Sequence, residues 1–387
     1  MDVINTNCLP QPDIIADYPL PITRWQEALC LDVTRGVEEI RTAYREYWPT
    51  QGELIFSGAC DFQCQHCVYP PSYARLNRVL PVAAWDRMLD DLVENLGIDT
   101  FVYGGRSVTA DGIDVLSNLR RRCPTASIGL IDNGISVLKD RARLFDVRPD
   151  WLDISIDGQE MDHDCQRGRD GSYRAGVDGA YWLAENQVAP KVNILACLTT
   201  LNVHSIIPMI VDLNRQGFRN FFVTPVTLVD GIRPSPALRL SGHAFADFFA
   251  KLRTALNELD DAWVEINLFS VEYAEYLARF IPEVWTEFKT ERDSILWHTN
   301  EGSGSNDLFV RYCPISLTGT REFIVNTNGD VIAPKSMAAG RVAGEHIAGN
   351  LLRQDAVRIV EALPDSNAFE FYIGEFLRER EVLLRYM

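Results

Sequence analysis

Short runs of β-branched and apolar residues alternate with helical patterns from about residue 52 to residue 225, and this alternation constrains the fold most. The predicted strands are Leu54–Ser57, Thr100–Tyr103, Ala126–Ile131, Leu152–Ile156, Val192–Thr199 and Asn220–Thr224. Apolar residues at helical spacing from Trp85 to Leu96 predict a helix that ends at Gly97. Six such units predict an α/β fold with a parallel sheet inside a layer of helices, either open or a partial barrel. Ligands of both architectures bind at the carboxyl ends of the strands.

The pattern changes after Pro234. It predicts a helix from Ser241, a strand near Val264–Leu268, a loop at 300–307, a β-hairpin and a last helix at about 365–385. The hairpin has strands Arg321–Val325 and Val331–Ile332 around an Asn328-Gly329 turn. We therefore divide the chain into an N-terminal extension (1–51), a barrel core (52–235), a helix-and-strand connector (236–306) and a C-terminal hairpin with its helix (307–387).

Charge and composition exclude several classes of partner. Lys and Arg number 37 against 54 Asp and Glu, a net charge of −17, which argues against nucleic acid or an anionic membrane as partner. The first residues carry acids and prolines in place of a signal peptide, and no apolar run approaches the ~20 residues that span a bilayer. We expect a cytoplasmic protein whose nine cysteines are metal ligands or thiols rather than disulfides.

Three of these cysteines form a triplet directly after the first predicted strand. Cys60, Cys64 and Cys67 have the spacing C-x3-C-x2-C, which puts three thiols in one loop at the carboxyl end of the strand. A structural zinc site normally has four ligands and uses C-x2-C pairs. A 4Fe–4S cluster held by three thiolates keeps one iron open for another ligand. Zinc with His66 or a distant residue as its fourth ligand, or chance spacing, is the alternative.

With this triplet, the chain resembles the radical S-adenosylmethionine (SAM) superfamily. The family motif is C-x3-C-x-aromatic-C, and His66 stands at the aromatic position. Gly104-Gly105 follow the second strand, where the family has a Gly-Gly-Glu-Pro-like turn that contacts the methionine amino group. Asn133 lies in an Asp-Asn-Gly similar to the Thr-Asn-Gly of the family. The resemblance implies a partial (β/α)6 barrel, one 4Fe–4S cluster on the triplet, and SAM as cofactor.

The segment from the fourth strand onward nominates further SAM contacts by the same resemblance. It is similar to the branch with a SPASM or twitch extension, in which a strand Ser and Asp approach the ribose and a following Arg meets the carboxylate. The residues nominated in this way are Ser155, Asp157, Arg167, Arg169, Thr199 and Asn202. In the C-terminal extension, Cys313 stands alone before the hairpin, and Ala333-Pro334-Lys335 replaces the expected Cys. We therefore expect a degenerate extension without an auxiliary cluster.

The function that the resemblance implies is cleavage of SAM to a 5′-deoxyadenosyl radical, which abstracts hydrogen from a substrate. The lack of an auxiliary cluster and the short N-terminal extension favour a small polar biosynthetic substrate over a ribosomal peptide, which is the alternative. Cys197 and Cys313 are candidate hydrogen-atom donors. A flavodoxin or ferredoxin would supply the electron. A non-catalytic iron–sulfur or zinc protein is a more distant alternative.

The triplet yields the first prediction. Replacing Cys60, Cys64 or Cys67 with Ala should abolish both the cluster and SAM cleavage, because each thiolate is a ligand. Replacing Cys313 should leave the iron content unchanged. Anaerobic iron quantification on the four variants checks this, and loss of several irons in the Cys313 variant would contradict the degenerate extension.

Overall fold

The computed structural model describes residues 22–69, 80–104, 108–228, 234–290, 294–300, 306–317, 322–332 and 347–386. These residues form one sheet of 13 strands in the order β13-β12-β11-β1-β2-β3-β4-β5-β6-β7-β10-β9-β8. The strands are β1 (Gln51–Leu54), β2 (Thr100–Tyr103), β3 (Ser127–Asp132), β4 (Trp151–Ser155), β5 (Val192–Leu198), β6 (Asn220–Pro225), β7 (Trp263–Leu268), β8 (Lys289–Thr290), β9 (Ile295–Asn300), β10 (Asp307–Tyr312), β11 (Glu322–Val325), β12 (Asp330–Ile332) and β13 (Ile347–Asn350). Neighbouring strands are parallel from β11 through β1 to β7 and β10, and antiparallel at both ends.

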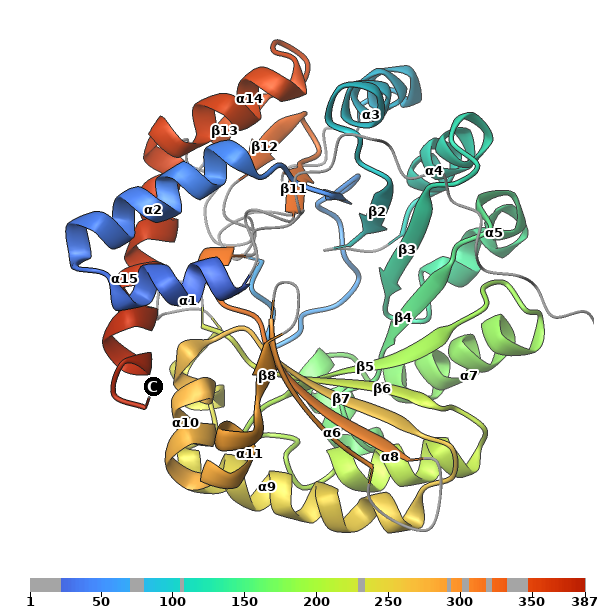
Figure 1. The fold of residues 1–387 in the computed structure, drawn as a ribbon. Coiled ribbons are helices and arrows are strands. Elements are labelled where there is room, and N and C mark those ends of the chain that lie inside the picture. Colours follow the sequence, from blue (N-terminus) through green and yellow to red (C-terminus); the bar gives the residue numbers. More distant parts are fainter. Residues whose placement is uncertain are drawn as a thin grey trace, which may run out of the picture.

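Helices cover the outside of the curved sheet (Figure 1). They are α1 (Ile22–Cys30), α2 (Val33–Glu46), α3 (Val82–Leu96), α4 (Ala110–Arg122), α5 (Arg141–Val147), α6 (Glu160–Arg167), α7 (Ser172–Glu185), α8 (Ile206–Arg215), α9 (Gly242–Ala255), α10 (Val271–Phe280), α11 (Pro282–Glu287), α14 (Ala356–Ala362) and α15 (Glu370–Leu383). The predicted partial barrel with a C-terminal hairpin and helix is confirmed. The C-terminal hairpin continues the core sheet, because β11 pairs with β1. No helix within the described ranges is both long and apolar enough to cross a bilayer.

The two faces of the sheet differ in chemistry, because side chains alternate along each strand. One set, which includes Phe101 and Ile194, is buried in the hydrophobic core with the helices. The other set lines the inside of the barrel and includes polar groups such as Glu53 on β1 and the register pair Asp153 and Asn193 on β4 and β5. The polar interior is therefore the face available for a ligand.

Helix α3 confirms the predicted helix and its end. It stops at Gly97, whose φ of 69° is left-handed, a conformation that glycine adopts without steric cost. The predicted bounds Leu54–Ser57 are wrong, since the strand covers Gln51–Leu54 while Ile55 and Phe56 are buried beyond it. The predicted loop is shorter on its C-terminal side, because Asp307 begins β10, and residues 301–305 lie outside the described residues.

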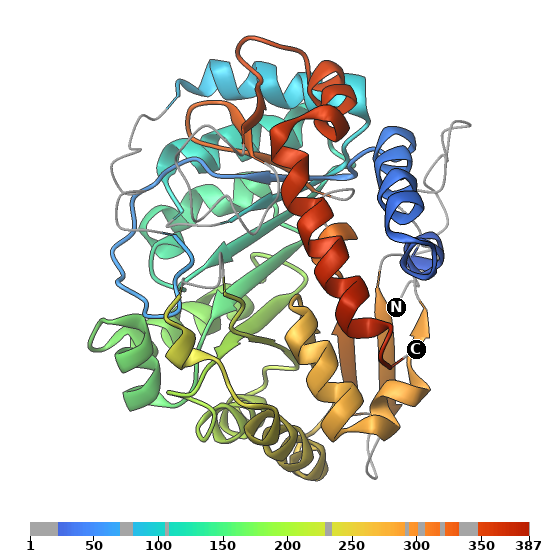
Figure 2. The same cartoon turned by 90° about the vertical axis from the view of Figure 1, so that its left-hand side faces the viewer.

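The last helix also differs from its prediction. A single helix at 365–385 was expected, but residues 363–369 form short 3-10 turns between α14 and α15. Pro364 lies in the first of these turns and cannot donate a backbone hydrogen bond. Helix α15 runs along the open side of the barrel, next to α10, α1 and α2 (Figure 2). The N-terminal extension thus contributes two helices to this side, and its residues 1–21 lie outside the described residues.

A buried polar network joins the N-terminal helices to α15. The Trp25 indole N–H donates to Ser316 Oγ over 2.8 Å, and the Tyr44 hydroxyl donates to the Ser316 carbonyl over 2.8 Å. The Ser316 hydroxyl in turn donates to the carboxyl group of Glu379, which is 1% exposed. Burial, reinforced by nearby Glu375, raises the pKa of Glu379 to about 8, so this side chain is protonated at neutral pH.

This network predicts a pH-dependent stability. Between the ordinary pKa of 4.5 and about 8, the folded state holds a proton on Glu379 that the unfolded state has lost. The contribution of Glu379 to the free energy of unfolding is therefore complete below pH 4.5. It declines by about 1.4 kcal/mol per pH unit as the pH rises between the two pKa values. Glu379→Gln should remove this slope in urea unfolding measured across the range. The control Glu381→Gln, at a side chain that is 75% exposed, should keep it; equal slopes in both variants would refute the assignment.

Candidate functional site

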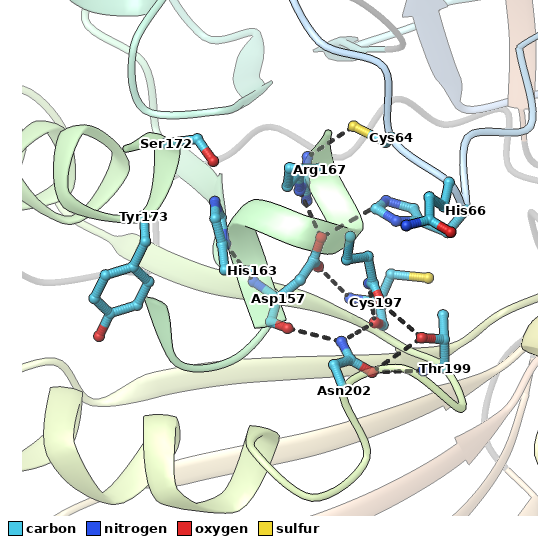
Figure 3. A network of polar contacts seen from close by, with 12 residues as sticks. Cys64, His66, Asp157, His163, Arg167, Ser172, Tyr173, Cys197, Thr199 and Asn202 are labelled. Carbon is cyan, nitrogen blue, oxygen red and sulfur yellow. Dashed lines mark hydrogen bonds and ion pairs between the residues drawn. The ribbon is translucent and has the colours of Figure 1, made fainter. Parts of the chain in front are cut away.

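The candidate site lies at the carboxyl ends of β1, β4 and β5, where three chain segments meet. The cysteine loop follows β1, Asp157 and helix α6 follow β4, and the turn with Thr199 and Asn202 follows β5. In parallel strands these ends share one edge of the sheet, so residues far apart in sequence come together. Figure 3 shows the resulting contacts.

Asp157 is the centre of this arrangement and is 0% exposed. One carboxylate oxygen accepts from Arg167 Nε over 2.5 Å, and the other accepts from the backbone N–H of Cys197 over 2.8 Å. Its own backbone N–H donates to His163 Nδ1 over 3.0 Å. Burial alone raises the pKa of Asp157, but the Arg167 guanidinium outweighs it, so the net pKa is below its usual range. The pair is ionised, the carboxylate is fully enclosed, and the Arg167 side chain is nearly so.

The turn after β5 is tied to the same centre. Asn202 donates from Nδ2 to the carbonyls of Asp157 over 2.7 Å and of Cys197 over 2.8 Å. Its Oδ1 accepts from the backbone N–H of Thr199 over 2.8 Å, and the Thr199 hydroxyl donates to Gln166 Oε1 over 2.6 Å. Both Thr199 and Asn202 are 0% exposed. These two residues, like Asp157, hold the loops together; that they contact the cofactor itself stays a prediction.

The cysteine loop lies against this centre. Arg167 Nη1 is 4.0 Å from Cys64 Sγ, and His66 Nε2 is 3.7 Å from an Asp157 carboxylate oxygen. Cys60, Cys64 and Cys67 are each partly buried, and no described cysteine forms a disulfide. Within the described ranges, no three His, Cys, Asp or Glu side chains lie close enough together to bind a metal ion. The three thiols therefore share a loop, but their sulfur atoms do not converge on one point.

Electrostatics in the loop follow from burial. Burial raises the pKa of Cys64 to about 12, although Arg167 acts in the opposite direction. Burial lowers the pKa of His66 to about 4 despite the nearby Asp157 carboxylate, so the imidazole is neutral at pH 7. The pKa of the buried Cys197 thiol is likewise raised well above its ordinary value. Cys197 therefore carries its hydrogen, as a hydrogen-atom donor must.

The remaining predicted residues take different places. Ser155, at the end of β4, is 8% exposed on the inner face. Asn133 accepts from the backbone N–H of Ile135 over 2.8 Å and so closes the turn after β3. The Arg169 guanidinium lies 5.1 Å from the ring centroid of Phe62, inside the cysteine loop. Cys313 is buried directly after β10, beside β7.

Two glycines were predicted after β2. Gly104 is buried, and a Cβ there would lie 3.2 Å from Glu53 Oε1, so the inner face is closely packed at this point. Gly105 lies outside the described residues. His163 and Gln166 belong to the site but were not predicted, and their position on α6, three residues apart and therefore on one helical face, is the signal that could have found them.

The residues present are of the types that bind an iron–sulfur cluster. Three thiols of one loop match a cluster with one open iron. His66 Nδ1 is buried without a hydrogen-bond partner among the described residues, which leaves a polar atom to be satisfied beside the thiols. Cys60, Cys64 and Cys67 would hold the cluster, and Arg167 would supply positive charge at its edge.

Comparisons with known structures support this interpretation at the level of the fold. The structure is similar to anSMEcpe with bound AdoMet and a Cp18Cys peptide (TM-score 0.56, 14% identity, 85% of this chain and 84% of that chain). It is also similar to SuiB of Streptococcus suis (TM-score 0.60, 12% identity, 88% of this chain and 75% of that chain). These neighbours are radical SAM enzymes, and the chain has their fold.

Sequence comparison yields a more partial match. The chain is 24% identical over 166 residues to pre-heme d1 synthase of Dinoroseobacter shibae. The match covers 43% of this chain and 40% of that protein, less than half of the relative's length. No family model matches the chain.

The geometry predicts that Asp157 has a large effect on stability. Asp157→Asn should lower the free energy of unfolding by roughly 3–5 kcal/mol, because Arg167, with a side chain 11% exposed, is left as a buried unpaired charge. The control Asp61→Asn breaks the exposed pair with Lys139 and should cost about 1 kcal/mol or less. Urea unfolding of the metal-free protein measures both. Equal losses in the two variants would show that the buried pair contributes no more than a surface one.

Proposed function

We propose that the protein is a radical SAM enzyme that holds one 4Fe–4S cluster on Cys60, Cys64 and Cys67. The observation that carries the proposal is the position of this triplet at the carboxyl end of β1, in a radical SAM fold, against a buried arginine. When bound, the cluster and SAM supply reductive cleavage of SAM to a 5′-deoxyadenosyl radical that abstracts hydrogen from the substrate.

The role of the chain's own residues is to bind and orient SAM. Arg167 is fixed by Asp157 with one terminal nitrogen still turned toward Cys64, which is the geometry of a group that meets an anionic ligand beside the thiols. Ser155, Gly104 and Gly105, Asn133 and Arg169 are the other candidate SAM contacts. Of the two candidate hydrogen-atom donors we favour Cys197, a protonated thiol on the inner face.

For the substrate we propose a small polar molecule. The polar inner face of the barrel, with Asp153 and Asn193 joined by a 2.8 Å hydrogen bond, supports a polar ligand. Helices α1 and α2 each bury one face against α15, and that face is therefore not available to a leader peptide. A peptide substrate is the alternative, favoured by likeness to SuiB, which has been captured with its precursor peptide. A flavodoxin or ferredoxin as electron donor and a cytoplasmic location complete the proposal.

The deciding experiment is anaerobic reconstitution followed by iron and sulfide analysis, reduction with dithionite in the presence of SAM, and chromatography for 5′-deoxyadenosine. We expect about four irons per chain and formation of 5′-deoxyadenosine, as one cluster requires. About eight irons would overturn the single-cluster proposal, and zinc or intact SAM would overturn the enzyme class.

The substrate class has its own test. A cell extract is divided by ultrafiltration, and each fraction is added to the reduced protein with SAM. A small polar substrate should raise 5′-deoxyadenosine formation with the filtrate alone, and digestion of that filtrate by protease should not remove the effect. Stimulation by the retained, protease-sensitive fraction would favour the peptide alternative.

A further inference from the structure

The cysteine loop rests on the last turn of α6 through backbone hydrogen bonds. The N–H of Gln63 donates to the Arg167 carbonyl over 3.3 Å, and the N–H of Gln65 donates to the Gln166 carbonyl over 2.8 Å. The Gln65 side-chain amide donates to the Cys165 carbonyl over 3.0 Å. The last carbonyls of a helix have no partner within the helix. Here the cysteine loop supplies those partners, so the loop and the helix end complete each other.

Gly168 lies at the point of closest approach. It follows the last residue of α6 with a φ of 65°, and Arg169 N–H donates back to the Asp164 carbonyl over 3.1 Å, which closes the helix in the manner of a Schellman motif. A Cβ at Gly168 would stand 2.7 Å from the carbonyl oxygen of Gln63. That oxygen belongs to the backbone of the cysteine loop and cannot rotate away as a side chain could.

These contacts bear on Cys64 directly. Cys64 lies between Gln63 and Gln65, and both of those residues are bonded to the helix end. The same turn carries Arg167, whose Nη1 is 4.0 Å from the Cys64 sulfur. The position of this thiol relative to the arginine is therefore set by how closely the loop approaches Gly168.

We propose that the C-terminal turn of α6, residues 165–169, shapes the cysteine loop, and that Gly168 is the positioning residue that admits the loop against it. The inference rests on the proposed function only where it concerns the cluster. A side chain at Gly168 would push Gln63 away, break the two backbone bonds and displace Cys64 from Arg167.

A glycine that ends a helix has a simpler role, and the chain provides a matched control for it. Gly97 ends α3 with a φ of 69°. Its N–H donates to the Val93 carbonyl and the Ile98 N–H donates to the Leu92 carbonyl, each one residue further back than the corresponding bond at Gly168, and no atom lies within 4 Å of its Cβ position. It precedes β2 and so lies at the opposite end of the parallel strands from the cysteine loop. Gly97→Ala imposes the same backbone strain without the collision.

The first measurement is hydrogen exchange by mass spectrometry on the metal-free protein, over peptides that cover residues 60–67. Gly168→Ala should exchange severalfold faster than wild type there, and Gly97→Ala should not. Asn tolerates a left-handed φ but still carries a Cβ. Gly168→Asn should therefore be as defective as Gly168→Ala, whereas a pure capping role predicts that Asn restores wild-type exchange and overturns the proposal.

The second measurement is the rate at which a chelator removes iron from the reconstituted variants. Both Gly168 variants should release iron severalfold faster than wild type and Gly97→Ala. If the Gly168 variants do not fold, Gln65→Ala removes the exposed side-chain tether alone and should still speed exchange over residues 60–67. Wild-type exchange and iron retention in the folded variants would overturn the inference. Absence of iron from every variant would refute the proposed function, and the exchange comparison would still decide the role of Gly168.

Discussion

One enclosed carboxylate joins the separate parts of this site. Asp157 accepts hydrogen bonds from Arg167 on α6 and from the backbone of Cys197 at the end of β5. It also lies near His66 of the cysteine loop. An ionised carboxylate without exposure is costly unless its oxygens are paired, and each oxygen here has a donor. Helix α6 and the end of β5 must therefore be in place together for the charge to be tolerated. The cysteine loop lies against this pair at His66.

The position of the site follows from the two faces of the strands. Apolar residues on the outer face pack under the helices, and the polar set is left inside the barrel. Because the strands are parallel, every loop after a strand opens at the same end, and the cysteine loop, α6 and the Asn202 turn converge there. The fold thus brings together groups from β1 to β5 that lie far apart in the sequence.

The sequence predicts this architecture well where periodicity and burial agree. β2 was predicted with its observed bounds, and Gly97 ends α3 as expected. At β1 periodicity and burial disagree. Ile55 and Phe56 are apolar and buried, but the strand ends at Leu54. Apolar residues indicate which positions are buried. The bounds of a strand depend instead on its pairing partners, such as β11, which lies far along the chain. The docking of α1 and α2 on α15 has the same long-range origin.

The residue types of the site were predictable from the sequence, but the role of each residue was less so. A polar residue after a strand has the same sequence signature whether it faces a ligand or closes a turn. Asn202 and Thr199 bond to one another, Thr199 also bonds to Gln166, and neither is exposed, so both hold the loops in place. Among the described residues, only Arg167 combines a buried partner on one nitrogen with a second nitrogen directed at a thiol. Rigidity in such a site comes from the buried hydrogen bonds between its loops, which leave one well-oriented cation beside the cysteines.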